Sequence, residues 1–277
     1  KKLKIYKKFA PLKDKDISRI KADSIFAIAD ELYRAEKFAA LKDFLVEAKM
    51  VFSYAKNRQK ISKNPLDGID FSKIYVVPES DGFGHIETDN DLRSLIAYCC
   101  DYAGSRDVRN ALILGLCTAL RAGNIRTLQK RHLRLDENGY YLAFNKDEMK
   151  VSSNGDMYLG IPQEIGEWLE NMDVGTHFFM GRAGKGLLSD AILSKALKDY
   201  APEDPKGRIV FHSFRSILST FSHEVDESDV SDYDISRVLS HKIRGVERSY
   251  NKSKSIATTR RVLTWWFRYL KDRGLKL

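Results

Sequence analysis

The chain has 277 residues, enough for one large or two ordinary domains, and its hydrophobic content of 43% supports folded cores. It contains no run of about 18 apolar residues, so we expect no membrane span, and its first residues lack the apolar stretch of a secretory signal. The net charge is +9, and residues 1–21 hold nine Lys or Arg against two Asp. This basic stretch indicates either a polyanionic partner, most simply nucleic acid, or a solvated tail.

Cysteine and histidine patterns give no sign of a metal centre. No Cys-x-x-Cys pair occurs, so we predict that the three cysteines are reduced core residues of a cytoplasmic protein: Cys99, Cys100 and Cys117. The six histidines form neither an HExxH motif nor a Cys/His cluster, so we expect no metal and no cofactor. Four histidines have no partner that the sequence identifies: His85, His132, His177 and His223.

The first part of the chain is predicted to be helical. Apolar residues recur at helical spacing from Asp16 to Leu32 and again from Phe38 to Ala55. The stretch SKNPLDG at 62–68 ends the second helix, because Asn-Pro and Gly interrupt helices. We therefore predict a small helical domain over 1–72 and a linker over 73–87.

Residues 88–277 are predicted to form a second domain. Thr88 resembles a helix N-cap, and helices are expected through Cys99 and from Asp107 to Leu120. Strands are expected at 132–136, 140–144 and 156–161, with a tight hairpin at Asn138-Gly139. The remaining expected helices span 163–171, 189–199, 212–225, 231–239 and 258–270. The fold class is therefore mostly α with a small antiparallel three-stranded sheet, a helical domain followed by an α+β domain.

Six polar residues of the second domain form a candidate set in chain order: Arg121, Lys150, His212, Arg215, His241 and Tyr250. Each alone has an ordinary explanation. The arginine after an apolar helix could satisfy terminal carbonyls, the His-x-x-Arg could be a surface pair, and the lysine could be a solvated turn residue. The tyrosine ring could pack on the core with its hydroxyl at the surface.

Together, the order Arg, Lys, His-x-x-Arg, His and then Tyr nine positions later resembles the tyrosine recombinases. The segment YAKNRQKISKNP at 54–65 is similar to the end of that family's amino-terminal domain. The tail RSYNKSKSIATTRRVLTWWFRYL at 248–270 looks most like integrases of phages and genomic islands. The resemblance covers nearly the whole chain and implies that 1–72 is a core-type DNA-binding domain and 88–277 the catalytic domain.

The resemblance also implies a role for each residue of the set. Tyr250 would be the nucleophile that attacks phosphorus, giving a 3′-phosphotyrosine and a free 5′-hydroxyl. Arg121 and Arg215 would hold the non-bridging oxygens through forked hydrogen bonds, and His241 would donate another. His212 would assist proton movement at the tyrosine. Lys150 would protonate the departing 5′-oxygen.

Two local features depart from the family pattern or leave an alternative open. Asn124 stands where many relatives have an acidic residue, three positions after the first arginine. Lys146 is a rival to Lys150 as the general acid, and Lys150 is preferred because Met149-Lys150 before the turn matches the integrases better.

The resemblance further implies partners. These are double-stranded DNA with attachment-site core sequences, a homotetramer on that DNA and, in some systems, accessory DNA-bending proteins, in the bacterial cytoplasm at the nucleoid. It implies too that the chain is a fragment without an arm-binding domain. Trp265 and Trp266 are predicted to be packing residues of a terminal helix that docks on its own or a neighbouring subunit. Two alternatives remain: a type IB topoisomerase-like strand transferase, and a catalytically silent DNA-binding protein on the same fold.

Overall fold

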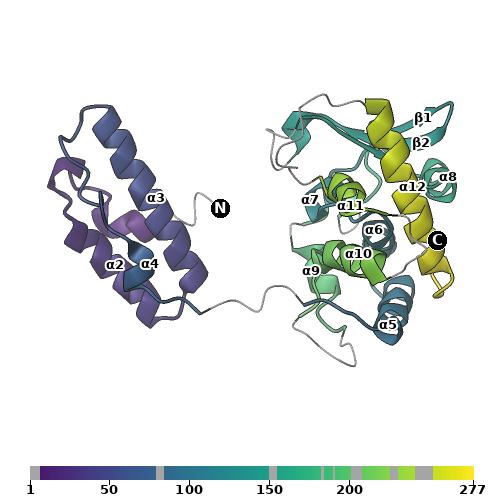
Figure 1. Cartoon of the computed structure of the whole chain (residues 1–277), viewed down its shortest axis with the longest axis horizontal. Coiled ribbons are helices and arrows are strands. Elements are labelled where there is room, and N and C mark those ends of the chain that lie inside the picture. Colours follow the sequence, from purple (N-terminus) through teal and green to yellow (C-terminus); the bar gives the residue numbers. More distant parts are fainter. Residues whose placement is uncertain are drawn as a thin grey trace. The chain divides into compact units, whose positions relative to one another are not determined.

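In a computed structural model the chain forms two compact units, Lys1–Ser80 and Asp81–Leu277, each with its own hydrophobic core (Figure 1). The structure describes residues 7–78, 84–149, 155–181, 184–189, 191–200, 208–224, 230–240 and 252–277. None of the helices in these ranges is both long and apolar enough to cross a membrane.

The described residues of the first unit form two 3₁₀ helices and three α-helices: η1 (Lys7–Leu12), η2 (Ile17–Arg19), α2 (Ala22–Arg34), α3 (Phe38–Asn57) and α4 (Phe71–Ile74). Its core forms where the apolar faces of α2 and α3 meet, with Ile25, Leu41 and Phe44 fully buried. The first long helix begins later than the apolar spacing predicted. The Asp16 carboxylate accepts the N–H of Ser18 and closes a separate short turn before α2.

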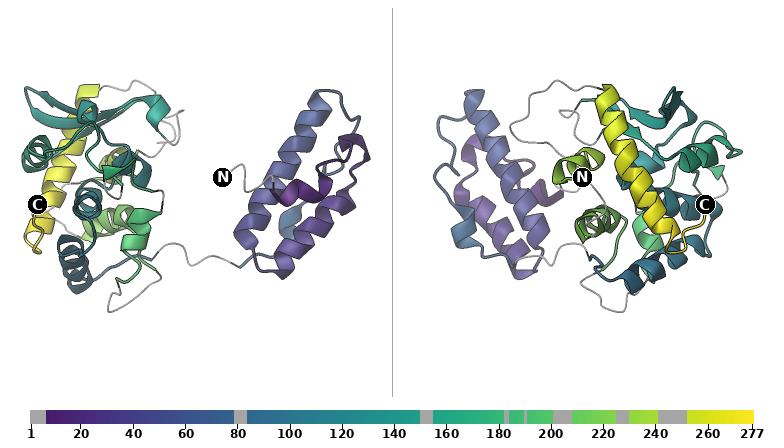
Figure 2. Two further views of the ribbon diagram at one scale, coloured as in Figure 1. Left: turned by 180° about the vertical axis from the view of Figure 1, so that it is seen from behind. Right: turned by 45° about the vertical axis from the view of Figure 1, so that its right-hand side comes forward.

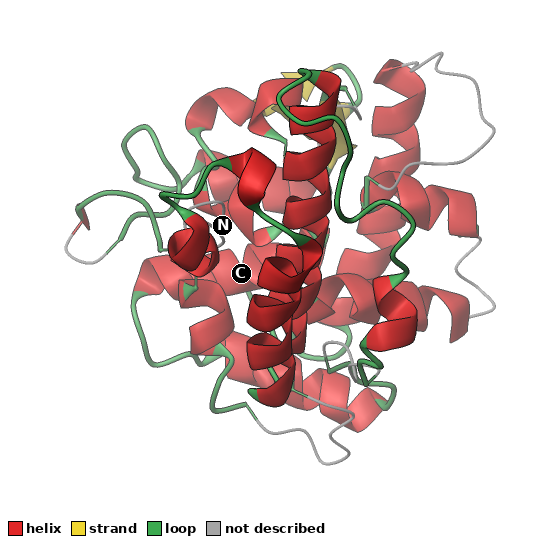
Figure 3. Ribbon diagram, turned by 90° about the vertical axis from the view of Figure 1, so that its left-hand side faces the viewer, coloured by secondary structure: helices red, strands yellow, loops and turns green. Residues whose placement is uncertain are grey.

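The second unit combines a small sheet at its edge with many helices (Figure 1), and helices dominate the ribbon of the chain in Figure 3. Its elements are α5 (Asp89–Cys100), α6 (Arg106–Thr118), α7 (Ala122–Arg126), η3 (Lys130–His132), β1 (Leu133–Asp136), β2 (Gly139–Phe144), η4 (Lys146–Glu148), β3 (Met157–Gly160), α8 (Gln163–Glu170), α9 (Ile192–Ala196), α10 (Ser213–Glu224), α11 (Asp232–Val238) and α12 (Lys252–Lys271). The predicted fold class, mostly helical with a three-stranded antiparallel sheet, is confirmed.

The sheet has strand order β1-β2-β3, and alternate residues of β2 are buried while most of β1 is exposed. Gly139 closes the β1–β2 hairpin at φ +119°, a conformation that favours glycine, as the Asn-Gly signal predicted. Leu142 and Leu159 pair across β2 and β3 and point into the core. The opposite face carries Gly160, where a Cβ atom would lie 2.3 Å from the carbonyl oxygen of Ile256 in α12. The missing side chain therefore lets α12 lie directly on the sheet.

The terminal helix α12 packs on its own chain, beside β3 and α6 (Figure 2). The Trp266 indole is fully buried and donates to the carbonyl oxygen of Leu116 at 2.8 Å. The helix starts six residues before the predicted Thr258. Its polar first turns are satisfied, because the Thr259 hydroxyl donates to Ser255 and accepts the Gly160 N–H at 2.8 Å. The packing role expected of the terminal tryptophans is thus met within one chain.

The end of α6 lies next to the start of α10, and these two segments lead to the candidate arginines. Helix α6 ends at Thr118, because Ala119 takes a left-handed conformation at φ +50° and Leu120 is already outside the helix. One turn earlier, Gly115 leaves space for the Phe211 ring, which would lie 2.2 Å from a Cβ atom there. Phe211 fixes the start of α10 against α6, so the two segments that carry the candidate arginines lie side by side.

Candidate active site

Arg215 is the best anchored residue of the candidate set. It lies in the first turn of α10, its side chain is 5% exposed, and its guanidinium donates to the carbonyl oxygen of Ala119 at 2.7 Å. A second hydrogen bond runs to the carbonyl oxygen of Leu239, just after α11. Arg215 thus joins the end of α6, the start of α10 and the end of α11 through one fixed planar group.

Arg121 lies beside it, two residues after Ala119, at the N-terminus of the short helix α7. In the described part of the chain, no hydrogen bond or ion pair occupies its half-buried guanidinium. Burial lowers its pKa. The pKa of Arg215 is lowered to about 10, first by burial and then by the positive charge of Arg121. Two guanidiniums that repel each other therefore lie close together, an arrangement that an anion between them would stabilise.

The start of α10 adds to the positive potential. The helix is 12 residues long, and its macrodipole places partial positive charge at the N-terminal end, where Arg215 lies. His212 is exposed immediately before this helix, and its carbonyl oxygen accepts the N–H of Arg215 at 3.2 Å. The His-x-x-Arg motif therefore sits at a helix N-terminus, with the histidine outward and the arginine inward.

Asn124 connects the Arg121 helix to the loop after β2. Its side chain is 5% exposed, and its amide nitrogen lies 3.5 Å from the sulfur of Met149. Because a thioether is a weak acceptor, this contact orients the asparagine only loosely. An acidic residue at this position would face sulfur, so the neutral amide suits Met149.

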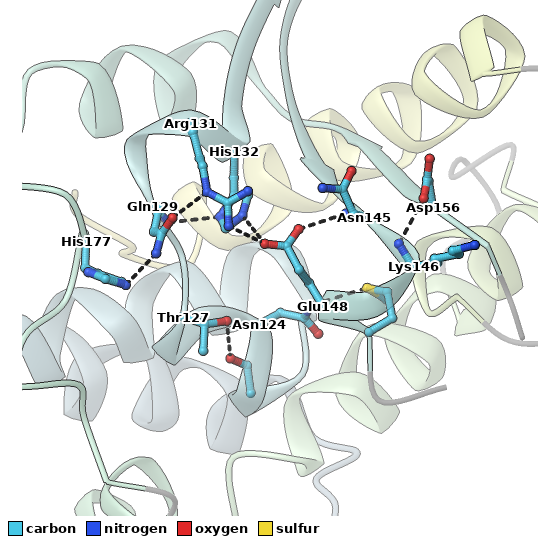
Figure 4. Close-up of polar contacts among 12 residues, drawn as sticks. Asn124, Thr127, Gln129, Arg131, His132, Asn145, Lys146, Glu148, Asp156 and His177 are labelled. Carbon is cyan, nitrogen blue, oxygen red and sulfur yellow. Dashed lines mark hydrogen bonds and ion pairs between the residues drawn. The ribbon is translucent and has the colours of Figure 1, made fainter. Parts of the chain in front are cut away.

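A denser polar network holds the same loop from the other side (Figure 4). The Glu148 carboxylate accepts from Nε2 of His132 at 3.0 Å, from Arg131 at 2.5 Å and from the N–H of Asn145 at 2.8 Å. Nδ1 of the buried His132 accepts the N–H of Gln129 at 3.0 Å. Burial opposes the charge of Glu148, but the hydrogen bonds from Asn145, His132 and Arg131 outweigh it and lower its pKa. Burial is also the main reason that the pKa of His132 is lowered.

Lys146, the rival general acid, lies in η4 at the start of this loop, with an exposed side chain. Its N–H donates to the Asp156 carboxylate at 2.9 Å, which ties the start of the loop to the residue before β3. Lys150, His241 and Tyr250 lie outside the described residues. The structure therefore brings Arg121 and Arg215 together, places His212 at the adjoining helix start, and leaves the other roles as predictions.

Sequence reasoning missed the network around Glu148. It identified no partner for His132, which is 2% exposed and uses both ring nitrogens. A histidine at the start of a predicted strand with a glutamate 16 positions later carries no recognisable spacing, so no local signal was present. The other three histidines without a predicted partner also have one: Glu87 for His85, Gln129 for His177 and Asp232 for His223. Within the described ranges no group of three or more His, Cys, Asp or Glu could hold a metal ion.

Comparisons with known proteins give matches in structure and none in sequence. No family model and no curated protein sequence matches the chain. The chain is similar to a lambda integrase fragment (75–356), solved as a dimer bound to a COC′ core site, with TM-score 0.62, 15% identity, and coverage of 99% of this chain and 89% of that one.

Two further solved structures share the arrangement. The Tn1549 transposon integrase with circular intermediate DNA gives TM-score 0.56 at 15% identity, covering 93% of this chain and 88% of that one. The XerH site-specific recombinase bound to a difH substrate gives TM-score 0.54 at 16% identity, covering 89% of this chain and 69% of that one. The chain therefore has the tyrosine recombinase fold.

Proposed function

We propose that this protein is a site-specific DNA recombinase of the integrase type, which cuts and rejoins strands through a 3′-phosphotyrosine intermediate. The observation that carries the proposal is the paired guanidiniums of Arg121 and Arg215. Arg215 is buried and oriented by two carbonyl oxygens, although burial, and after it the charge of Arg121, lowers its pKa. Such an arrangement costs stability unless an anion occupies it, and a DNA phosphate is the anion that the fold's relatives were solved with.

In the proposed reaction the Tyr250 phenolate oxygen bonds to the scissile phosphorus and the bond from phosphorus to the 5′-oxygen breaks. The additional negative charge on the non-bridging oxygens is stabilised by Arg121 and Arg215. His212 accepts or returns the tyrosine proton, and His241 donates a hydrogen bond to the phosphate. The departing 5′-oxygen takes its proton from a lysine of the β2–β3 connection, Lys150 or its rival Lys146.

The reverse step uses a 5′-hydroxyl of another strand, which attacks the phosphotyrosine and releases the phenol. Bond energy is kept in the phosphodiester, so the reaction needs no nucleotide cofactor. We propose double-stranded DNA as the partner and a tetramer on two duplexes as the working assembly. With a net charge of +9, the affinity for DNA should fall steeply as salt rises, since phosphate contacts release counterions.

The test uses suicide duplexes, which carry a nick close to a randomised core sequence so that a cleaved short strand diffuses away and traps the intermediate. The wild-type protein is incubated with this pool, and covalent protein–DNA adducts are separated in denaturing gels. We expect an adduct with wild type and none with Tyr250→Phe.

The matched control is Tyr233→Phe, which removes the hydroxyl of an exposed tyrosine in α11. This variant should form the adduct at the wild-type level. An adduct of equal yield with Tyr250→Phe would overturn the assignment of the nucleophile. DNA binding by the wild type with no adduct from any sequence in the pool would favour a silent DNA-binding protein. Relaxation of supercoiled plasmid without strand exchange would favour the topoisomerase alternative.

A further inference from the structure

We infer that Glu148 is a positioning residue for leaving-group protonation: with His132 and Arg131 it fixes the base of the β2–β3 connection, and so the lysine that supplies the proton. The inference rests on the proposed function and adds to it a residue outside the candidate set. Its structural part uses residues at the start of the connection and the segment 129–132 that contacts them.

The connection is held where β2 ends. Phe144 of β2 pairs with Met157 of β3, and the chain between them carries both candidate lysines. Directly after β2, the three residues of η4 are closed by the Glu148 carboxylate, which accepts the N–H of Asn145 at 2.8 Å. Glu148 therefore sets the direction in which the chain leaves the sheet.

The same carboxylate is fastened to a rigid part of the unit. His132 is 2% exposed, and its ring lies 4.8 Å from the ring of Phe144, centroid to centroid. Its Nδ1 accepts a backbone N–H, which leaves the proton on Nε2 and aims it at Glu148. A ring nitrogen that accepts a hydrogen bond carries no proton, so this contact fixes a neutral ring and its tautomer, and burial lowers the pKa of His132 in the same direction.

The network reaches the arginine pair through the short segment that follows α7. Residues 127–132 run from the end of α7 to η3, and Asn124 of α7 contacts Met149, the residue after Glu148. The segment with Arg121 and the base of the lysine-bearing connection are thus joined firmly through Glu148 and its partners, and more loosely through Asn124 and Met149. A fixed distance between the phosphate clamp and the general acid is what proton transfer to a defined oxygen requires.

A neutral amide is a poor replacement for this carboxylate. Three N–H donors, from His132, Arg131 and Asn145, converge on its two oxygens. A glutamine offers one acceptor oxygen and an NH₂ group, so at least one donor would meet another donor. Glu148→Gln should therefore displace η4 without removing any proposed catalytic group.

The experiment measures cleavage by the full-length protein on two substrates, one normal and one with sulfur in place of the bridging 5′-oxygen. The duplexes are the sequences recovered from the adducts of the wild type. A thiolate leaves without an acid, so only defects in protonation are rescued. On normal DNA, Glu148→Gln should be slower by about 10- to 100-fold, as expected for a misplaced acid. On the sulfur substrate it should come within about threefold of wild type.

Two further variants serve as controls, one expected to be unaffected and one expected to be defective on both substrates. Glu164→Gln, an exposed residue of α8, should match wild type on both substrates. Arg215→Ala should be defective on both, since loss of the phosphate clamp is independent of the leaving group. If Glu148→Gln melts below the assay temperature, Glu148→Asp takes its place. It keeps the charge, but the shorter side chain does not span all three donors, so a smaller defect with the same rescue is expected.

Equal rates for Glu148→Gln and wild type on normal DNA would overturn the inference, as would a defect of the same size on both substrates. Failure of the wild type itself to form an adduct would count against the proposed function instead. The two failures are therefore distinguishable in one set of reactions.

Discussion

The two arginines of the site do opposite things for stability although both are proposed to bind the same phosphate. Arg215 satisfies two buried carbonyl oxygens and holds three segments together. Arg121 has no partner in the described part of the chain and adds a repulsive charge to its neighbour. Replacing either arginine should therefore abolish activity, but only the replacement of Arg215 should lower the stability of the protein.

We predict that Arg215→Ala lowers the free energy of unfolding by about 2–4 kcal/mol, because the carbonyls of Ala119 and Leu239 lose their buried donor. Arg121→Ala should leave it unchanged or raise it slightly, since a repulsion is removed. Both variants should lose DNA cleavage. Chemical denaturation with the adduct assay checks this, and an Arg121→Ala protein as unstable as Arg215→Ala would contradict it.

Residue types could be predicted at this scale, but their partners could not. The arginines and histidines of the set were recognisable by their order along the chain. Arg215 donates to the main-chain oxygens of Ala119 and Leu239, and a pattern of side chains does not predict a contact with main-chain atoms. The contact between Glu148 and His132 was not predicted for a similar reason, because it arises from the turn of η4 and the burial of the ring.

At the scale of elements, the packing of α12 on the sheet depends on the absence of a side chain at Gly160. A Cβ atom at Gly160 would meet the main chain of α12, which is unable to move aside as a flexible side chain would. We predict that Gly160→Ala lowers the free energy of unfolding by about 2–3 kcal/mol, in the range of an overpacked core position.

The control is Gly175→Ala, where a Cβ atom meets nothing within 4 Å. It should be neutral or slightly stabilising, because alanine restricts the unfolded chain more than glycine does. The two melting temperatures decide the matter. A Gly160→Ala protein as stable as the Gly175→Ala control would show that α12 tolerates displacement from the sheet.

The Asp234 carboxylate links helix α11 to α12, and the strength of this link depends on pH because the carboxylate can be protonated. Asp234 accepts from the N–H and hydroxyl of Ser231 and from Arg261 at 2.8 Å. Burial works against its charge, but these partners prevail and lower its pKa. A lowered carboxyl pKa gives stability that is complete above the ordinary value near 3.9 and is lost as pH falls through the lower, folded value.

We predict that Asp234→Ala costs about 1–2 kcal/mol at neutral pH, as for loss of a helix cap. The difference between wild type and variant should shrink as pH falls below about 4. Urea denaturation at a series of pH values measures it. A difference that stays constant down to the most acidic sample would contradict the role of the charge.

Element types were predictable where local signals agreed, as for the Asn-Gly hairpin and the Thr88 cap, whose hydroxyl accepts the N–H of Asp91. Predicted helix boundaries were wrong where polar side chains of the helix form hydrogen bonds with other parts of the fold. The Ser- and Thr-containing start of α12 reads as non-helical, yet its hydroxyls bond to its own turn and to β3. The short helix α7 also went unpredicted, since five residues are too few for a period.

At the scale of the molecule, the two hydrophobic cores have no residue in common among those that the structure describes. All three tryptophans, Trp168, Trp265 and Trp266, belong to the second unit. We therefore expect tryptophan fluorescence to follow the second unit alone, while far-ultraviolet circular dichroism follows the helices of both. Their denaturation curves should not coincide, and superimposable curves would indicate a single cooperative unit.

The most direct test of the central claim is to identify the amino acid that carries the DNA. The covalent adduct from the suicide substrate is digested with nuclease and protease, and the nucleotide-bearing peptide is sequenced by mass spectrometry. The proposed chemistry predicts a single peptide containing Tyr250, joined through its phenolic oxygen to a 3′-phosphate. A nucleotide on any other residue, or on a 5′-phosphate, would contradict it.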